Sequence, residues 1–414
     1  MPSALAFVLD ALIFIALAWV AWRALGRSLP IAVIPIVIGL LLAATGALPP
    51  AWGVPSAIGD RVGWVGVLLL AFTAGLETRL SAHLPTAADA APLPRTQALR
   101  FVASAGMALL LPFVAGTLAA HHYFTGLPGW DAPRGGAWMG SLAIGLCLAV
   151  SALPVLIGIV RELGPLHRPL TQLALRIAVI DDAVLWIGLA LLLLAAEGGS
   201  LLAGASGLHV LAVAVAVVLA AAGTLAQRLR AQPPGWLVWL SLPVFLAAGA
   251  WASSQLGLHA LLGAYFGGAM VPPAWSKRLP VERLGRFALI GLAPLFFGHS
   301  GLKIDGSVLG WASLQAALAL LALAVAAKLT AALLCPPSSA LSRRDALAVG
   351  ALLQCKGLME IVAATILRDK GLLSEHAFAA LVTLAVLSTL LTGPFFRLLV
   401  KRRAAATTDE RQPA

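Results

Sequence analysis

Two adjacent carboxylates, Asp181 and Asp182, are the residues of this chain best suited to bind a proton or a cation. They lie near the middle of an apolar stretch, residues 173–194, that is long enough to span a bilayer. A charged side chain at the centre of a membrane helix costs about 2.5–3.5 kcal/mol, so the pair must face protein or water and serve a purpose. Successive helical residues are about 100° apart, so the two carboxylates should have different partners. We take them as the predicted working site.

Three basic residues, Arg176, Lys328 and Lys356, also lie inside apolar stretches. The depth of Lys328 in its stretch lets its long stem reach the aspartates. Burial disfavours an unpaired ammonium, so a pair between Lys328 and one aspartate is the most favourable arrangement for both charges. This pair serves either transport or stability alone. Arg176 either adds positive charge beside the site or extends its head group to the membrane surface.

Polar residues interrupt two further apolar stretches, which are the fifth and the twelfth along the chain. These polar residues are Ser151, Pro154, Gln354, Lys356, Gly357 and Glu360. The proline removes one backbone hydrogen bond, so a break is expected there. The two stretches are seven apart and so run in opposite directions, and inverted repeats with broken helices mark a secondary transporter with its site at the midplane. An ordinary proline kink beside a polar helix is the alternative, and on an unbroken helix Lys356 and Glu360 would neutralise each other.

The composition indicates a polytopic membrane protein. Of 414 residues, 60% are hydrophobic and 11% are charged, against about 25% charged in soluble domains, and the mean hydropathy is +0.95. The net charge of +11 does not indicate nucleic-acid binding, because the basic residues are scattered between apolar runs. Cys147, Cys335 and Cys355 have no paired spacing, so we expect neither disulfides nor a metal site but small buried side chains.

We predict an all-α protein of thirteen transmembrane helices. The predicted spans are 4–22, 29–48, 62–80, 97–120, 137–160, 169–196, 207–227, 234–256, 258–273, 285–302, 309–335, 345–367 and 375–398. Alternate loops and the tail on one side hold 20 of the 28 Lys and Arg residues, and the opposite loops hold five. The positive-inside rule therefore places the amino terminus outside and the carboxyl terminus in the cytoplasm. A cleaved signal peptide is not expected, because no basic region precedes the first apolar run.

Seven stretches, in this order, resemble the cation/proton antiporter 2 family of sodium/proton and potassium/proton exchangers. They are FTAGLETRL at 72–80, AVSALPVLIGIVRELGPL at 149–166, IDD at 180–182, GLHALLGAYFGGAMVP at 257–272, APLFFGHSGLKID at 293–305, AKLTAALL at 327–334 and CKGLMEIV at 355–362. The resemblance implies a single membrane domain, 1–414, that forms a homodimer. Its dimerisation part would be 1–80 and 234–302, and its core ion-transport part 97–196 and 309–398. A linker helix at 207–227 and a short cytoplasmic tail at 399–414 complete the expected fold.

The resemblance also implies roles for the site residues. Asp182 would coordinate the cation and exchange protons, while Asp181 would pair with Lys328. Ser151 and backbone carbonyls freed at its break would help to hold a monovalent cation, since hard cations prefer oxygen ligands. Glu77 would serve an interfacial or secondary role, and Arg176 departs from the small or hydroxyl residue of the family pattern.

The expected activity is exchange of sodium or potassium for protons, without enzymatic chemistry or a cofactor. The doubled aspartate resembles electrogenic members, whereas KGLME at 356–360 resembles potassium-handling relatives. The resemblance therefore does not decide whether sodium or potassium is exchanged. The expected location is a bacterial inner membrane. A cation channel, a sodium-coupled symporter of organic anions with similar crossed helices, and a sensor without transport are the alternatives. Proton flux that depends on the cation distinguishes exchange from a channel, and sodium-driven uptake of a labelled acid identifies a symporter.

Overall fold

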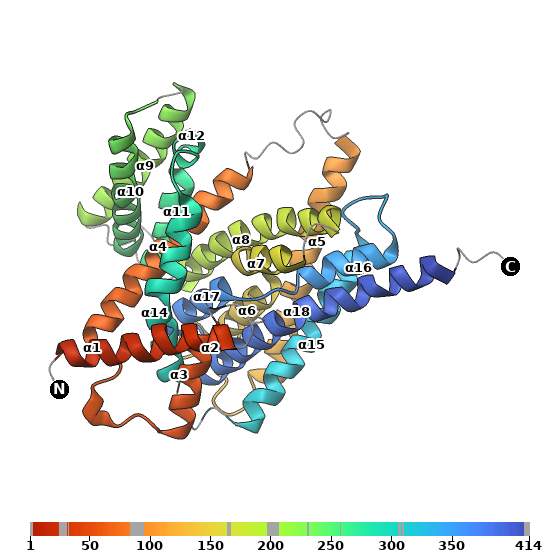
Figure 1. Cartoon of the computed structure of the whole chain (residues 1–414), viewed down its shortest axis with the longest axis horizontal. Coiled ribbons are helices and arrows are strands. Elements are labelled where there is room, and N and C mark those ends of the chain that lie inside the picture. Colours follow the sequence, from red (N-terminus) through yellow and green to blue (C-terminus); the bar gives the residue numbers. More distant parts are fainter. Residues whose placement is uncertain are drawn as a thin grey trace. The chain divides into compact units, whose positions relative to one another are not determined.

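The computed structural model describes residues 3–24, 31, 33–82, 95–163, 167–196, 207–229, 232–256, 258–304, 308 and 310–409. Throughout these residues the regular structure is helical, which confirms the predicted all-α class (Figure 1). The chain forms two compact units. Unit 1 holds Met1–Thr86 and Ala190–Leu309, and unit 2 holds Ala87–Leu189 and Gly310–Ala414.

Apolar helices identify the chain as a multi-pass membrane protein. Within the described ranges, eight helices are long and apolar enough to cross a membrane, and three shorter apolar helices lie at Val33–Thr45, Gly136–Ala149 and Ala260–Met270. Each of the thirteen predicted spans contains a helix or a pair of helices. Thirteen crossings remains a prediction.

Unit 1 is a helical bundle built from two separate segments of the chain. In chain order its helices are α1 (Ser3–Ala11), α2 (Ala18–Ala24), α3 (Val33–Thr45), α4 (Ala57–Ala82), α9 (Gly207–Arg228), α10 (Gly235–Gln255), α11 (Ala260–Met270), α12 (Pro273–Ser276), α13 (Val281–Phe287) and α14 (Ala293–Leu302). A π-helical turn at Leu12–Leu17 joins α1 and α2 into one long rod (Figure 1). A second π-helical turn, Ala288–Leu292, joins α13 to α14.

Small residues allow α4 and α11 to approach closely. A Cβ atom on Gly268 of α11 would lie 2.1 Å from the carbonyl oxygen of Phe72, and one on Gly75 of α4 would lie 2.1 Å from that of Tyr265. Membrane helices associate through such close backbone contacts, because lipid supplies little hydrophobic drive between them. Glycine at both positions therefore sets how closely the helices pack in unit 1.

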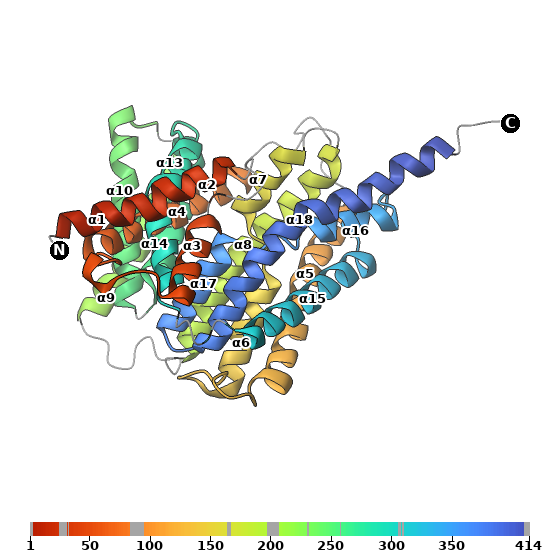
Figure 2. The ribbon, with the colours of Figure 1, turned by 60° about the horizontal axis from the view of Figure 1, so that its bottom comes forward.

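Unit 2 contains the same pattern twice. Its helices are α5 (Arg95–Ala119), α6 (Gly136–Ala149), α7 (Leu153–Leu163), α8 (Arg168–Ala196), α15 (Trp311–Leu334), α16 (Arg343–Leu352), α17 (Leu358–Asp369) and α18 (Glu375–Asp409). The last turns of α8 continue into unit 1. Each repeat is a long helix, a broken pair and a second long helix, and α15, α16 and α18 pack side by side (Figure 2).

Both predicted interruptions are present. The fifth span breaks between α6 and α7, and the twelfth breaks between α16 and α17. Pro154 lies in the first turn of α7, where a proline loses no helical bond, so it begins the second half-helix rather than kinking a continuous one. Its side chain lies outside the described residues. The carboxyl-terminal helix is longer than predicted, since α18 runs through Asp409 into the expected tail at 399–414.

Candidate ion-exchange site

A buried ion pair with a shared hydroxyl occupies the centre of unit 2. The Nζ atom of Lys328 on α15 lies 3.0 Å from Oδ2 of Asp181 on α8, and neither side chain is exposed. Ser151, in the first helix break, places its Oγ 2.6 Å from the same Asp181 oxygen and 2.5 Å from Lys328 Nζ. The structure thus brings together Ser151, Asp181 and Lys328.

The second helix break contacts the first. Ser151 Oγ lies 2.7 Å from the carbonyl oxygen of Leu353, and the backbone N–H of Ala152 donates to the carbonyl of Cys355 across 2.7 Å. Gln354 donates from Nε2 to the carbonyl of Ala324, one turn before Lys328 on α15, at 2.8 Å. Broken backbone is tolerated at membrane depth only where protein or water satisfies its polar groups, and here groups of each break bond to the other.

Lys356 binds the end of the first half-helix. Its ammonium donates to the carbonyl oxygens of Cys147 at 2.7 Å, Leu148 at 2.8 Å and Val150 at 3.0 Å. Its distance to Glu360 Oε2 is longer, 3.9 Å. An unbroken helix would make the two an i,i+4 pair, but Lys356 precedes the start of α17 at Leu358. The closest partners of this ammonium are therefore carbonyls.

Hydroxyls on α18 hold the second break from its other side. Ser388 donates to the carbonyl of Gln354, and Thr389 donates to the carbonyl of Lys356. All three of Ser388, Thr389 and Gln354 are buried. Sequence reasoning missed these hydroxyls. The sequence shows a Ser-Thr pair in the middle of an apolar span. Such a pair is not specific, because Ser and Thr hydroxyls in helices often bond to carbonyls of their own helix.

The remaining predicted residues lie at different depths. Asp182 is fully buried on α8, directly after Asp181. Arg176 is exposed on the same helix, as expected for a side chain that extends to the membrane surface. Glu77 is partly buried near the end of α4 in unit 1. Arg176 and Glu77 thus do not share the buried position of the aspartates.

The formal charges of this site do not cancel. Among the described residues of unit 2, the buried charged side chains are Asp181, Asp182, Glu360, Lys328 and Lys356. With all five ionised, three carboxylates face two ammonium groups, which leaves one negative charge. Buried charges must be paired or neutralised. One proton or one monovalent cation restores neutrality, and this is the chemistry that the arrangement supports.

Two broken helices that meet beside buried, paired charges define a membrane transporter of the discontinuous-helix class. The family described as "Sodium/hydrogen exchanger, transmembrane" matches residues 11–402. The chain belongs to this family, which consists of transporters rather than catalytic enzymes.

Curated relatives are similar over most of the chain. Cation/H(+) antiporter 20 of Arabidopsis thaliana is 29% identical over 87% of this chain and 43% of its own length. K(+)/H(+) antiporter 1 of Saccharomyces cerevisiae is 26% identical over 88% of this chain and 42% of its own length. The chain therefore spans less than half of these two relatives. The Na(+)/H(+) antiporter of Enterococcus hirae is 24% identical and is matched over 92% of its length, with 89% of this chain covered.

A solved structure shares the fold. The sodium proton antiporter MjNhaP1 of Methanocaldococcus jannaschii aligns with a TM-score of 0.64 at 14% identity, over 95% of this chain and 99% of that one. This likeness establishes the architecture.

Proposed function

We propose that this chain is a secondary active antiporter that exchanges a monovalent cation, sodium or potassium, for protons. The observation that carries the proposal is the single uncompensated negative charge among the buried residues of unit 2. Asp181 is paired with Lys328 at 3.0 Å, and Asp182, fully buried directly after it, is the carboxylate to which the family resemblance assigns the proton and the cation. The family and the names of the relatives support the same activity.

Ser151 is the proposed second ligand of the cation. A hydroxyl has one donor and two acceptor lone pairs. Lys328 occupies one lone pair at 2.5 Å, and the Ser151 proton is donated to Asp181 or to the Leu353 carbonyl. One lone pair remains for a hard cation. The carbonyls of Cys147, Leu148 and Val150, by contrast, are bonded by Lys356, so they are not part of the proposed site.

Exchange follows from competition for Asp182. Cation binding on one side of the membrane displaces the proton, and proton binding on the other side displaces the cation. Release of Lys328 from Asp181 would let that carboxylate carry a second proton, and this is how electrogenic exchange would arise. We propose that Asp182 and Asp181 exchange protons in this way, with Lys328 as the charge partner.

Alternating access needs one part of the protein to move. We propose that unit 2, which holds residues 97–189 and 310–398 of the predicted core parts 97–196 and 309–398, moves against unit 1, which covers the dimerisation parts 1–80 and 234–302. Helix α9 follows α8 in the chain and packs against α10 and α11, which supports its proposed role as the linker. Two copies would form a homodimer.

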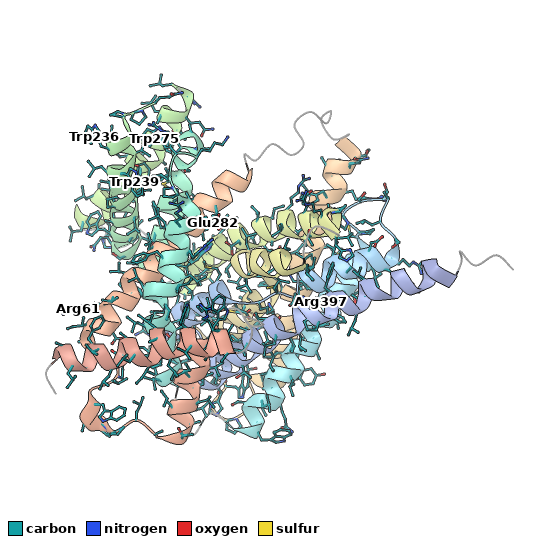
Figure 3. All side chains as sticks on the ribbon, in the orientation of Figure 1. Arg61, Trp236, Trp239, Trp275, Glu282 and Arg397 are labelled. Carbon is teal, nitrogen blue, oxygen red and sulfur yellow. The ribbon has the colours of Figure 1, made fainter. Side chains whose placement is uncertain are left out.

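Aromatic residues support a membrane–water interface at one end of unit 1, and the positive-inside rule supports the side that it faces. Trp236 and Trp239 of α10 and Trp275 of α12 lie at the same end of unit 1 (Figure 3). Trp236 is 67% exposed and Trp239 is 49% exposed, and tryptophan is enriched at the membrane–water interface. Arg278 at this end donates to the Pro233 carbonyl at 2.7 Å. We propose that this end is cytoplasmic, with the amino terminus outside, in a bacterial inner membrane.

The proposal is tested with the purified chain in liposomes that have an acidic interior. A pH dye reports the gradient while sodium, potassium or lithium is added outside. We expect the added cation to dissipate the pH gradient in the wild type but not in Asp182→Asn. The cation that dissipates the gradient identifies the transported ion. Asp131→Asn, an exposed carboxylate of unit 2, is the control and should retain full activity. Retained exchange in Asp182→Asn, or no response to any of the three cations in the wild type, would reject the assignment.

A further inference from the structure

Glu360, in the second broken span, is a buried carboxyl group without a hydrogen-bond donor. It lies in the first turn of α17, and its side chain is 3% exposed. Neither of its carboxyl oxygens has a hydrogen-bond partner in the part of the chain that the structure describes. A carboxylate in the first turn of a helix is stabilised by the free backbone N–H groups there, but no described N–H group bonds to Glu360. The helix start therefore gives this carboxyl group no hydrogen bond.

The neighbouring ammonium of Lys356 does not supply a donor either. Lys356 Nζ lies 3.9 Å from Glu360 Oε2, which is beyond hydrogen-bonding distance. An ammonium has three N–H donors, and Lys356 donates to three carbonyls at the end of the first half-helix at 2.7, 2.8 and 3.0 Å. Turning Lys356 toward Glu360 would release at least one of these carbonyls. The ammonium therefore attracts Glu360 by its charge alone.

A protonated carboxyl group fits this environment better than a carboxylate. Burial penalises a charge far more than a neutral polar group, and a buried charge needs hydrogen bonds as well as a partner of opposite sign. With Glu360 neutral, two carboxylates and two ammonium groups remain among the buried described residues of unit 2, so their charges sum to zero. We propose that Glu360 is a further proton-binding residue, which holds a proton while no cation is bound.

The helices packed against α17 bring no further charge to Glu360. Helix α6 contains one titratable residue, Cys147, and α18 contains none over its middle part, 377–396. Cys147 and the other nearby thiol, that of Cys355, are both buried, and buried thiols are neutral. Lys328 is the second ammonium whose charge acts on Glu360. The two other charged residues of α17 lie in its last turn, at the opposite end of the helix.

A proton on Glu360 would couple cation binding to proton release, and this step rests on the proposed function. A cation bound at Asp182 adds a positive charge to a group of charges that already sums to zero. Release of the Glu360 proton restores the balance, so the O–H bond of Glu360 breaks and its proton passes to water as the cation binds. This electrostatic coupling acts beside the direct competition of proton and cation for Asp182.

Glu360→Gln is the discriminating variant, because its amide has nearly the shape of a protonated carboxyl group and cannot ionise. The measurement is the unfolding temperature of the full chain in detergent from pH 5 to pH 9, without sodium or potassium. In the unfolded chain a glutamate loses its proton at about pH 4.3. If folded Glu360 keeps its proton above that pH, the wild type loses stability relative to Glu360→Gln as the pH rises, by up to tenfold in the unfolding equilibrium per pH unit.

An ionised Glu360 that stabilises Lys356 predicts a different result. Glu360→Gln would then be less stable than the wild type by a constant amount over the whole pH range, and such parallel curves would overturn the proposal. Failure of Glu360→Gln to fold would also overturn it, because the amide replaces a group that we propose to be neutral. Glu375→Gln is the matched control and should follow the wild-type curve. Glu375 also lies 3.9 Å from a cation, Arg368, but its side chain is 49% exposed.

Infrared spectroscopy detects the proton directly, because a protonated carboxyl group has a C=O stretching band that a carboxylate lacks. At pH 6 without sodium or potassium, this band should be stronger in the wild type than in Glu360→Gln, and equal bands would overturn the proposal. Adding the transported cation should weaken the wild-type band. A band that persists in a preparation that exchanges ions would overturn the coupling to exchange. The unfolding and cation-free infrared measurements do not depend on transport, so failure of the exchange proposal would leave their results interpretable.

Discussion

The ammonium of Lys356 lies 2.7 Å from the carbonyl oxygen of Cys147, and this bond connects the second helix break to the end of α6. The last carbonyls of a helix have no partner within it and form the negative end of the helix dipole. The Lys356 ammonium is the positive charge that binds these carbonyls at the end of α6. The transported cation must therefore find its ligands elsewhere, at Asp182 and Ser151 in our proposal.

Replacing Lys356 by methionine should destabilise the protein and stop exchange. The change removes the donor to three buried carbonyls, and each unsatisfied buried polar group costs about 1–3 kcal/mol. Thermal unfolding in detergent and dye-based transport are the measurements. Lys277→Met, at an exposed position of unit 1, serves as the control. A Lys356→Met protein that melts like the wild type would show that water or other groups replace the ammonium.

Removing Lys328 should lower stability as well as activity. Lys328→Ala leaves Asp181 without its ammonium in a fully buried position, and breaking a buried pair costs about 3–5 kcal/mol. The double variant Lys328→Met with Asp181→Asn removes both charges, so it should recover most of the stability without recovering exchange. Equal melting temperatures of Lys328→Ala and the wild type would contradict the pair.

Ser151→Ala should raise the cation concentration needed for half-maximal exchange. The hydroxyl contacts Asp181, Lys328 and the Leu353 carbonyl, and it is the proposed neutral ligand. Loss of its net hydrogen bonds should also cost about 0.5–1.5 kcal/mol of stability for each bond. Ser141→Ala is the matched control, because Ser141 donates only within α6, to Ala137 at 2.7 Å. Equal effects of the two substitutions on apparent affinity would remove Ser151 from the proposed site.

Acidification should weaken cation binding if protons and cations compete for Asp182. Where the proton occupies the site, each unit of pH decrease should raise the half-maximal cation concentration by up to tenfold. The measurement is the same dye assay repeated from pH 6 to pH 9 with a constant gradient. An apparent affinity that does not vary with pH would argue against a shared site.

Gly268→Ala should destabilise unit 1, because its Cβ would lie 2.1 Å from the Phe72 carbonyl. Overpacking of this kind costs about 1–3 kcal/mol. Gly106→Ala on α5 is the control, since nothing lies within 4 Å of its Cβ, and it should be neutral or stabilising by up to about 1 kcal/mol. Melting temperatures in detergent compare the two. A Gly268→Ala protein as stable as Gly106→Ala would show that α4 and α11 can separate without cost.

Much of the architecture was readable from local properties of the sequence. Long apolar runs specify membrane helices wherever they occur, because a backbone in lipid must bond to itself. The two breaks were also readable, since proline, glycine and clustered polar residues disrupt a helix through their own chemistry. The order of the motifs then indicated the family, which the match over residues 11–402 shows.

The sequence by itself thus determined the all-α membrane class, the two broken spans and the identity of the carboxylates at the centre. Only the tertiary structure decided which carbonyls Lys356 binds, that the Ser151 hydroxyl joins Asp181 to Lys328, and that Glu360 is buried without a hydrogen-bond donor among the described residues. Ser151 and Lys328 are separated by 177 positions in the chain, and Cys147 and Lys356 by 209. Helical periodicity gives the face of a residue within its own helix, but contacts over such separations depend on how the helices pack.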